Sequence, residues 1–112
     1  MEIADLSTDR VHQVAVYLAA AEAARRTRHH VTVVEEDRRF RLEIGGHLAR
    51  VFTRRTAQER PMRRGTQQDT EGARALVFVD LSGEVPAFYV TAPDVAVGEV
   101  EQDLDRWDRF DT

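Results

Sequence analysis

The stretch that decides the fold spans residues 39–54 and reads RFRLEIGGHLARVFTR. Apolar and charged residues alternate over residues 39–44, and a period of two predicts a strand that is buried on one face. Gly45 and Gly46 follow directly, and a two-residue glycine loop between two such stretches favours a tight hairpin turn. We therefore expect an antiparallel hairpin whose second strand covers residues 47–55.

The two-residue turn also determines which residues of the hairpin face each other. One face carries the more apolar pairs and the other face carries the charged residues. The expected pairs are Ile44–His47, Leu42–Ala49 and Phe40–Val51 on the first face, and Glu43–Leu48, Arg41–Arg50 and Arg39–Phe52 on the second. The register thus predicts an "arginine face" made of Arg39, Arg41, Glu43, Arg50, Phe52 and Arg54.

Upstream of the hairpin, the sequence predicts a helix and then a short strand. Apolar residues recur at helical spacing over residues 8–27, and N-cap candidates stand at residues 7–9. A β-branched run at residues 31–34 predicts a strand, which the polar residues 35–37 close with a turn. We expect the helix to pack on the sheet that these strands begin.

Downstream of the hairpin, the sequence predicts a loop, two strands and a second helix. Residues 56–72 are polar and aperiodic, which is typical of a mobile loop. Residues 75–81 are nearly all apolar, as in a central strand covered on both faces, and a further strand is predicted at residues 87–90. A helix is then predicted to open at Pro93, with an apolar stripe made of Val97, Val100, Leu104 and Trp107.

These elements predict the fold class, which is a single α/β (α+β) domain over residues 1–112. The expected order is α-β-β-β-loop-β-β-α, with one mixed sheet flanked by two helices. A chain of this length buries one core of modest size and has no room for a second.

The composition excludes several kinds of chemistry. All sixteen Lys-or-Arg residues are arginine, so no lysine is present for a Schiff base or a phosphate-binding loop. The chain contains no cysteine, which removes disulfides and thiolate chemistry. Neither a long apolar run nor a secretion signal is visible, so we expect a cytoplasmic protein that does not enter membranes.

Charge is distributed unevenly along the chain, although the formal net charge is only −4. Residues 38–64 hold nine arginines and two glutamates, a net charge of +7, whereas residues 80–112 hold nine acidic residues and two arginines, a net charge of −7. Complementary fields of this size favour association, so we expect a homodimer or a protein partner. The basic segment is also suited to nucleic acid or to an anionic small molecule.

One part of the sequence resembles a known family. The segments Leu76–Leu81 and Pro86–Val90, followed by Pro93, are similar to a stretch that follows the catalytic strands in small bacterial members of the PD-(D/E)XK, or restriction-endonuclease-like, nuclease superfamily. The order of elements, with a glycine-turned hairpin after the first helix, also resembles the core of that superfamily. The resemblance covers residues 8–107 and implies a restriction-endonuclease-like core.

The same resemblance implies an active site that has lost its metal-binding residues. In the family, an Asp on the second strand and a Glu or Gln and a Lys on the third share one face, and the carboxylates hold a divalent metal that activates water. Matching this sequence to those strands puts Arg41 at the Asp position, Phe52 at the Glu or Gln position and Arg54 at the Lys position. Mg²⁺ prefers oxygen ligands, which these side chains lack. We therefore expect no metal and no cofactor.

The favoured hypothesis is a catalytically degenerate nuclease-fold domain, a pseudo-nuclease that works by binding. Its arginine face, together with Arg63 and Arg64 of the loop, is expected to contact nucleic acid, an anionic ligand or a protein partner. Metal-dependent nuclease activity is not expected.

Two alternatives remain open. The chain could be a diverged enzyme, either a residual metal-dependent nuclease in which Glu43 acts with Glu22 or Asp37, or a small-molecule enzyme in a repurposed cleft. The arginine face could also be an ordinary solvated surface with its acid in ion pairs. His29 and His30 point to opposite sides of an extended chain and lack a third ligand, so they do not favour a metal site.

Overall fold

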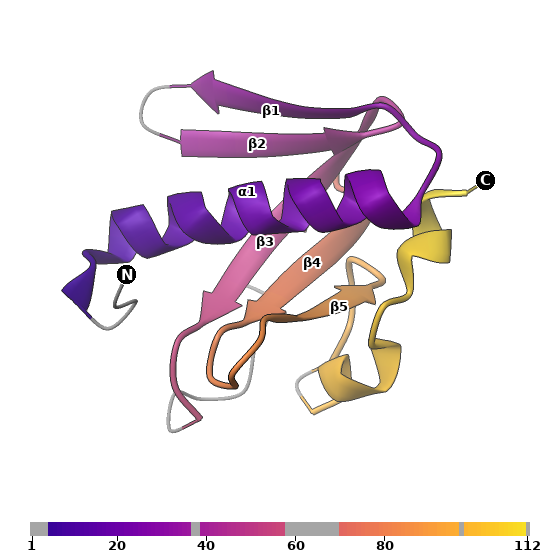
Figure 1. Cartoon of the computed structure of the whole chain (residues 1–112). Coiled ribbons are helices and arrows are strands. Elements are labelled where there is room, and N and C mark those ends of the chain that lie inside the picture. Colours follow the sequence, from indigo (N-terminus) through magenta and orange to yellow (C-terminus); the bar gives the residue numbers. More distant parts are fainter. Residues whose placement is uncertain (1–4, 37–38, 58–69, 97, 112) are drawn as a thin grey trace.

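The structure is a computed structural model that describes residues 5–36, 39–57, 70–96 and 98–111, apart from the side chains of Glu36 and Arg39. This part of the chain folds into one α-helix, five strands and two short 3-10 helices. In chain order they are α1 (Thr8–Arg26), β1 (Val31–Glu36), β2 (Arg39–Ile44), β3 (His47–Arg54), β4 (Ala75–Asp80), β5 (Ala87–Thr91), η2 (Val100–Asp103) and η3 (Trp107–Phe110). Figure 1 shows α1 lying across one face of the sheet.

The five strands form one sheet in the order β1-β2-β3-β4-β5. Neighbouring strands are antiparallel except for β3 and β4, which are parallel. The prediction of a mixed sheet is therefore confirmed at the level of α+β architecture.

The helix α1 begins and ends where the sequence supplies caps. Oγ of Ser7 accepts a hydrogen bond from the backbone N–H of Arg10 at 3.2 Å, and the hydroxyl of Thr27 donates to the carbonyl of Ala23 at 2.8 Å. The predicted helix over residues 8–27 is confirmed to within one residue. Small side chains let it lie close to the sheet, and its buried residues are Val11, Ala15, Val16, Ala19 and Ala23. None of the described helices is long and apolar enough to cross a membrane.

Apolar side chains cover both faces of the sheet. The larger cluster lies between α1 and the sheet and includes Leu42, Ile44, Val77, Val79, Trp107 and Phe110. The smaller cluster lies on the opposite face and consists of the buried residues Leu76, Phe78, Val95 and Val100. Strand β4 contributes to both clusters and is buried along its whole length. This confirms the prediction of a central strand covered on both faces.

The hairpin of β2 and β3 turns at Gly45 and Gly46, as predicted, with positive φ angles of 61° and 81°. The expected pairs nearest the turn are confirmed, namely Ile44–His47, Glu43–Leu48 and Leu42–Ala49. The three expected pairs farther from the turn are not part of the ladder, namely Phe40–Val51, Arg41–Arg50 and Arg39–Phe52. From Ala49 onward, β3 pairs with β4 up to Arg54–Asp80 and diverges from β2 (Figure 1).

One other predicted segment differs from the structure at its end, and one lies mostly outside the described residues. Strand β1 continues past residue 34 to Glu36, because Glu35 and Glu36 pair with Phe40 and Arg39 in place of forming a turn. Residues 58–69, the greater part of the predicted loop, lie outside the described residues.

The prediction of a second α-helix after Pro93 is wrong. The described residues of this region form the short 3-10 helices η2 and η3. Gly98 and Asp105 have positive φ angles of 91° and 54°, which a right-handed helix does not contain, so no continuous helix runs from Pro93 to Trp107. The apolar stripe is divided between the two faces of the sheet, because Val100 packs in the smaller cluster and Trp107 in the larger one. One straight helix cannot serve both faces. In the described chain the sheet is therefore flanked by one α-helix, where two were predicted.

The segment that follows covers the outer edge of β5. Leu104, which the stripe predicted as buried, forms an isolated antiparallel bridge with Tyr89 and is 53% exposed. The backbone N–H of Asp105 donates to the carbonyl of Phe88 at 2.8 Å. The chain thus passes from one face of the sheet to the other around β5.

Candidate functional site

The arginine face lies on the side of the sheet turned away from α1. Leu42 of β2 and Ala49 of β3 pack in the larger cluster beneath α1, and side chains alternate along a strand. Their neighbours therefore point to the other side, which confirms the common face predicted for Arg41, Glu43, Arg50, Phe52 and Arg54. The side chain of Arg39 and the whole of Arg63 and Arg64 fall outside the described residues.

Arg54 is held by a carboxylate at the carboxyl ends of the two parallel strands. Its Nη2 atom lies 2.5 Å from Oδ2 of Asp80, which is the partner of Arg54 in the β3–β4 register. The two side chains are only 18% and 10% exposed. Oδ1 of Asp80 also accepts hydrogen bonds from the backbone N–H and the hydroxyl of Ser82, at 2.9 and 2.6 Å. Both carboxylate oxygens thus have donors within the fold.

These donors set the protonation state of Asp80. Burial alone would raise the pKa of its carboxyl group, but the hydrogen bonds from Arg54 and Ser82, together with the charge of Arg54, bring that pKa below its ordinary value. The pKa of the Tyr89 phenol is raised by burial and by the negative charges of Asp80 and Glu101. At neutral pH Asp80 is therefore a carboxylate and Tyr89 is a neutral phenol.

Glu43, the residue that the enzymatic alternative requires, is paired with an arginine of its own strand. Nε of Arg41 lies 3.2 Å from Oε2 of Glu43, and residues two apart in a strand share a face. Glu22, which was expected to lend a second carboxylate, lies on α1 and therefore on the other side of the sheet. Asp37, the other expected helper, lies outside the described residues. The structure brings neither of them to Glu43.

Among the described arginines of this face, Arg50 is the one without a carboxylate partner. Arg41 and Arg54 each have an acidic partner, whereas the described residues give Arg50 no ion pair, and its Nε atom is buried without a hydrogen-bond partner. Phe52 follows two residues later on the same face, and its ring stacks on that of Phe78 with centroids 5.2 Å apart. The positive charge of Arg50 thus lies on the same face as the stacked rings of Phe52 and Phe78.

Asp80 is the residue of this face that sequence reasoning missed. The signal was present, because Asp80 is the one charged residue in the apolar stretch Ala75–Leu81. A carboxylate at the end of a buried strand needs a cation or several donors to offset its loss of hydration. The identity of that cation depended on the parallel pairing of β3 with β4.

Two of the described histidines, His29 and His47, take part in contacts between elements. Within the described ranges, no three His, Cys, Asp or Glu side chains are placed to hold a metal ion. Nε2 of His29 lies 2.7 Å from Oδ1 of Asp111, and Nε2 of His47 lies 3.2 Å from Nη2 of Arg74. Because a guanidinium only donates, Nε2 of His47 accepts in this contact. His29 and His47 thus join segments that are distant in the sequence.

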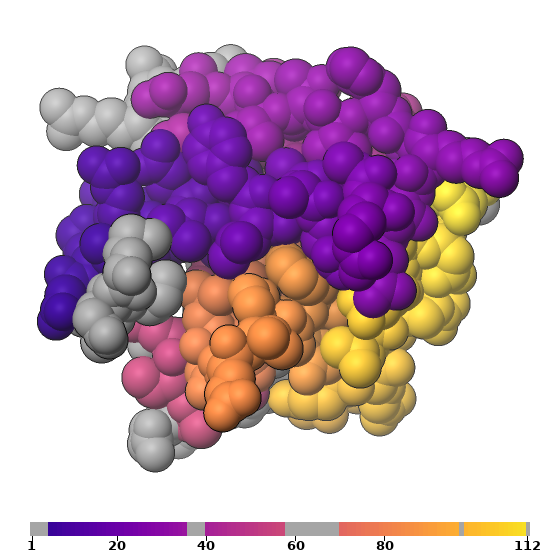
Figure 2. All heavy atoms as spheres, in the orientation of Figure 1, coloured from indigo at the N-terminus to yellow at the C-terminus, as the bar shows by residue number. Residues whose placement is uncertain are grey.

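A concave surface, which the sequence did not predict, lies beside α1. It is a groove of about 530 Å³ between the C-terminal half of α1, the start of β5 and the segment around Leu104. In Figure 2 these segments meet where the violet, orange and yellow surfaces come together. Its apolar lining consists of Leu18, Ala21, Pro86, Ala87, Phe88 and Leu104.

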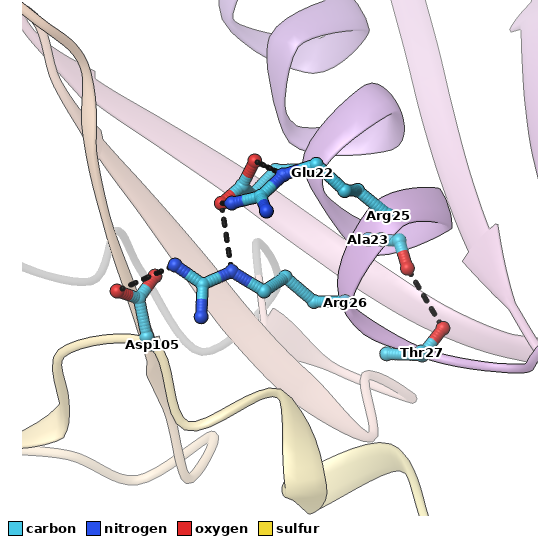
Figure 3. Close-up of polar contacts among 6 residues, drawn as sticks. All are labelled: Glu22, Ala23, Arg25, Arg26, Thr27 and Asp105. Carbon is cyan, nitrogen blue, oxygen red and sulfur yellow. Dashed lines mark hydrogen bonds and ion pairs between the residues drawn. The ribbon is translucent and has the colours of Figure 1, made fainter.

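The charged residues of this groove pair with one another (Figure 3). Glu22 accepts hydrogen bonds from Nε and Nη2 of Arg25, at 3.1 and 2.8 Å, and from Nε of Arg26 at 3.0 Å. Nη2 of Arg26 also lies 3.4 Å from Oδ2 of Asp105. The hydrogen bond from Arg25 lowers the pKa of Glu22 against the opposing effect of burial. Two positive and two negative side chains leave the groove without a preference for either sign of charge.

Comparisons with known proteins gave no relative of this chain. Neither the protein-family models, nor the curated proteins, nor the solved structures contain a match. The resemblance to the PD-(D/E)XK superfamily therefore stays a prediction, and the arginine face is interpreted from its own geometry.

Proposed function

We propose that this chain is a binding domain whose arginine face takes up an anionic group through Arg50. The observation that carries the proposal is the buried Nε atom of Arg50, which lacks an acceptor among the residues that the structure describes. An arginine stays charged at physiological pH, and a buried donor without an acceptor costs about 1 to 3 kcal/mol. A carboxylate or phosphate oxygen of a ligand would supply the acceptor.

The neighbours of Arg50 favour an anion that also carries an apolar or aromatic part. Phe52 and Phe78 form a stacked pair on the same face, and a flat ring packs well against such a wall. Arg54 is assigned a structural role, because its Nη2 atom is held by the buried carboxylate of Asp80. Its Nε atom, like that of Arg50, has no hydrogen-bond partner among the described residues, but only Arg50 lacks an acidic partner there as well. Arg41 contributes positive charge that its neighbour Glu43 only partly balances in an exposed pair.

We further propose, from the sequence resemblance, that the domain is a degenerate member of the PD-(D/E)XK nuclease superfamily. Arg41, Phe52 and Arg54 stand at the positions where the family carries its acidic residues and lysine. Their common face supports this match, since the family's motif also requires one face. A cation and an aromatic ring at the carboxylate positions support binding in place of metal-dependent hydrolysis.

The anion proposal is tested by titrating the wild type and Arg50→Met with short duplex DNA, single-stranded RNA and inorganic pyrophosphate, and by a thermal-shift screen of anionic metabolites. We expect the wild type to bind at least one of these anions. The Arg50→Met substitution should weaken that binding by about 10- to 100-fold, which corresponds to about 1.5 to 3 kcal/mol for a charge-assisted hydrogen bond.

Two controls separate a ligand-binding arginine from a structural one. Arg10→Met changes an exposed arginine of α1, on the other side of the sheet, and should leave the affinity unchanged. Because methionine removes a buried donor that lacks an acceptor, Arg50→Met should not lower the melting temperature of the free protein. No binding by the wild type, or equal losses in the two variants, would contradict the proposal.

A further inference from the structure

The sheet has two outer edges, and the described chain covers one of them. At β5, the carbonyl of Phe88 accepts from Asp105, and the carbonyl of Val90 accepts from Nε of Arg109, both at 2.8 Å. At β1, no described strand pairs on the side that faces away from β2. Figure 1 shows this edge of β1 facing away from the rest of the described chain.

The register of β1 with β2 identifies the backbone groups that point outward. The N–H of Gly45 donates to the carbonyl just before Val31 at 2.8 Å, one residue outside the pair Val31–Ile44. In an antiparallel ladder this makes Val31–Ile44 a pair without hydrogen bonds of its own, so the N–H and C=O of Val31 point away from β2. The pattern repeats at every second residue, so Val33 and Glu35 also direct their backbone groups outward.

Most of strand β1 lacks the features that usually protect a free edge. Natural edge strands carry charged side chains, a proline or a bulge, or they are very short, and in β1 the charged residues are confined to Glu35 and Glu36 at its end. Strand β1 has six residues, VTVVEE, and pairs regularly with β2 from Val31 to Glu36. Val33 and Val34 stand at its centre. Its outward N–H and C=O groups are therefore suited to pairing with another strand.

The charges around β1 favour a second copy of this chain, in antiparallel orientation, as that strand. Arg28 and His30 precede β1 and are exposed, and the exposed Glu35 lies near its other end. Antiparallel pairing brings the acidic end of one copy to the basic end of the other, whereas parallel pairing places like charges side by side. A two-fold axis at Val33 opposes Val33 to Val33 and Val31 to Glu35 of the second copy, and it uses only outward-pointing groups. An axis at Glu35 would oppose two carboxylates.

We propose that β1 of one copy pairs with β1 of a second copy about a two-fold axis at Val33, so that two sheets become one continuous sheet. Residues directly opposite in an antiparallel pair share a face. The arginine faces of the two copies then lie on the same side of the joined sheet. The interface involves none of the residues proposed to bind the anion. The dimer proposal can therefore fail while the anion-binding proposal holds, and the reverse.

The first experiment measures the mass of the full chain by light scattering and sedimentation over a wide concentration range. The wild type is expected to dimerise, and Glu35→Pro is expected to be a monomer. Proline removes an outward N–H that the monomer does not use, so circular dichroism of the variant should still show the native fold. Glu35→Gln keeps the N–H and loses only the charge, so it should still form a dimer, although a weaker one than the wild type. A monomeric wild type, or a dimeric and folded Glu35→Pro, overturns the proposal.

The second experiment tests the register, because the natural chain has no cysteine. The proposed pairing places Thr32 opposite Val34 of the second copy in a pair without hydrogen bonds, where Cα atoms are about 4.5 Å apart and a disulfide fits. Mixing Thr32→Cys with Val34→Cys chains under mild oxidation should give a cross-linked dimer, and each variant alone should give far less. Cross-linking of Thr32→Cys with itself would indicate parallel pairing and overturn the proposal.

Discussion

Strand β2 and the β3–β4 pair each place an arginine–acid pair on the arginine face, but the two pairs are built differently. Arg41 and Glu43 belong to one strand, and their side chains are 39% and 32% exposed. Arg54 and Asp80 come from two parallel strands, are 18% and 10% exposed, and receive further support from Ser82. Exposed pairs contribute little, whereas breaking a buried pair is costly. Burial, more than pairing, therefore decides how much each acid stabilises the fold.

Removal of each acid should have the largest effect on stability. Asp80→Ala leaves the guanidinium of Arg54 shielded from water without a counter-charge, and it removes the acceptor of Ser82. We expect the free energy of unfolding to fall by about 2 to 3 kcal/mol. The matched variant Glu43→Ala should lower it by less than about 1 kcal/mol. Urea denaturation of both variants at neutral pH is the measurement, and losses of equal size would show that burial does not separate the pairs.

The contribution of Asp80 to stability should depend on pH, because the pKa of its carboxyl group in the folded protein lies below the ordinary value of 3.8. A carboxylate with a lowered pKa contributes stability that is complete above the unfolded-state pKa and is lost as the pH falls through the folded-state pKa. Asp80→Asn has no such charge to lose. We therefore expect the gap in melting temperature between the wild type and Asp80→Asn to be constant from about pH 7 to pH 5 and to shrink below about pH 4. A gap that persists unchanged to about pH 2 would contradict the assigned role of the carboxylate.

The two pairs also differ in how far the sequence predicts them. Arg41 and Glu43 share a face by strand alternation alone, and the turn at Gly45 and Gly46 determined the register next to it. Arg54 and Asp80 are 26 residues apart, and their contact requires β3 to leave β2 and run parallel to β4. No local pattern contains that information.

The region after Pro93 shows a different limit of sequence reasoning. The apolar stripe that predicted a second helix is real, but Val100 and Trp107 bury themselves on opposite faces of the sheet. The spacing of apolar residues predicts that they are buried, but it does not predict which face of the sheet they pack against. The groove beside α1 was unpredictable for the same reason, since its lining comes from three segments, with Leu18, Phe88 and Leu104 among its residues.

The smallest expected effect concerns the hairpin, where the family resemblance would place nuclease chemistry. We expect no cleavage of supercoiled plasmid, single-stranded DNA or RNA with Mg²⁺ or Mn²⁺, and Glu43→Gln should behave as the wild type does. The carboxylate of Glu43 is paired with Arg41, and Arg50 adds positive charge to the same face, so a divalent cation meets repulsion where it would need several oxygen ligands. Gel analysis of nicked and linear products is the measurement, with a heat-treated sample to exclude a contaminant. Cleavage by the wild type that Glu43→Gln abolishes would overturn the binding interpretation and establish the residual nuclease in its place, because a single exposed ion pair would then have proved no obstacle to metal binding.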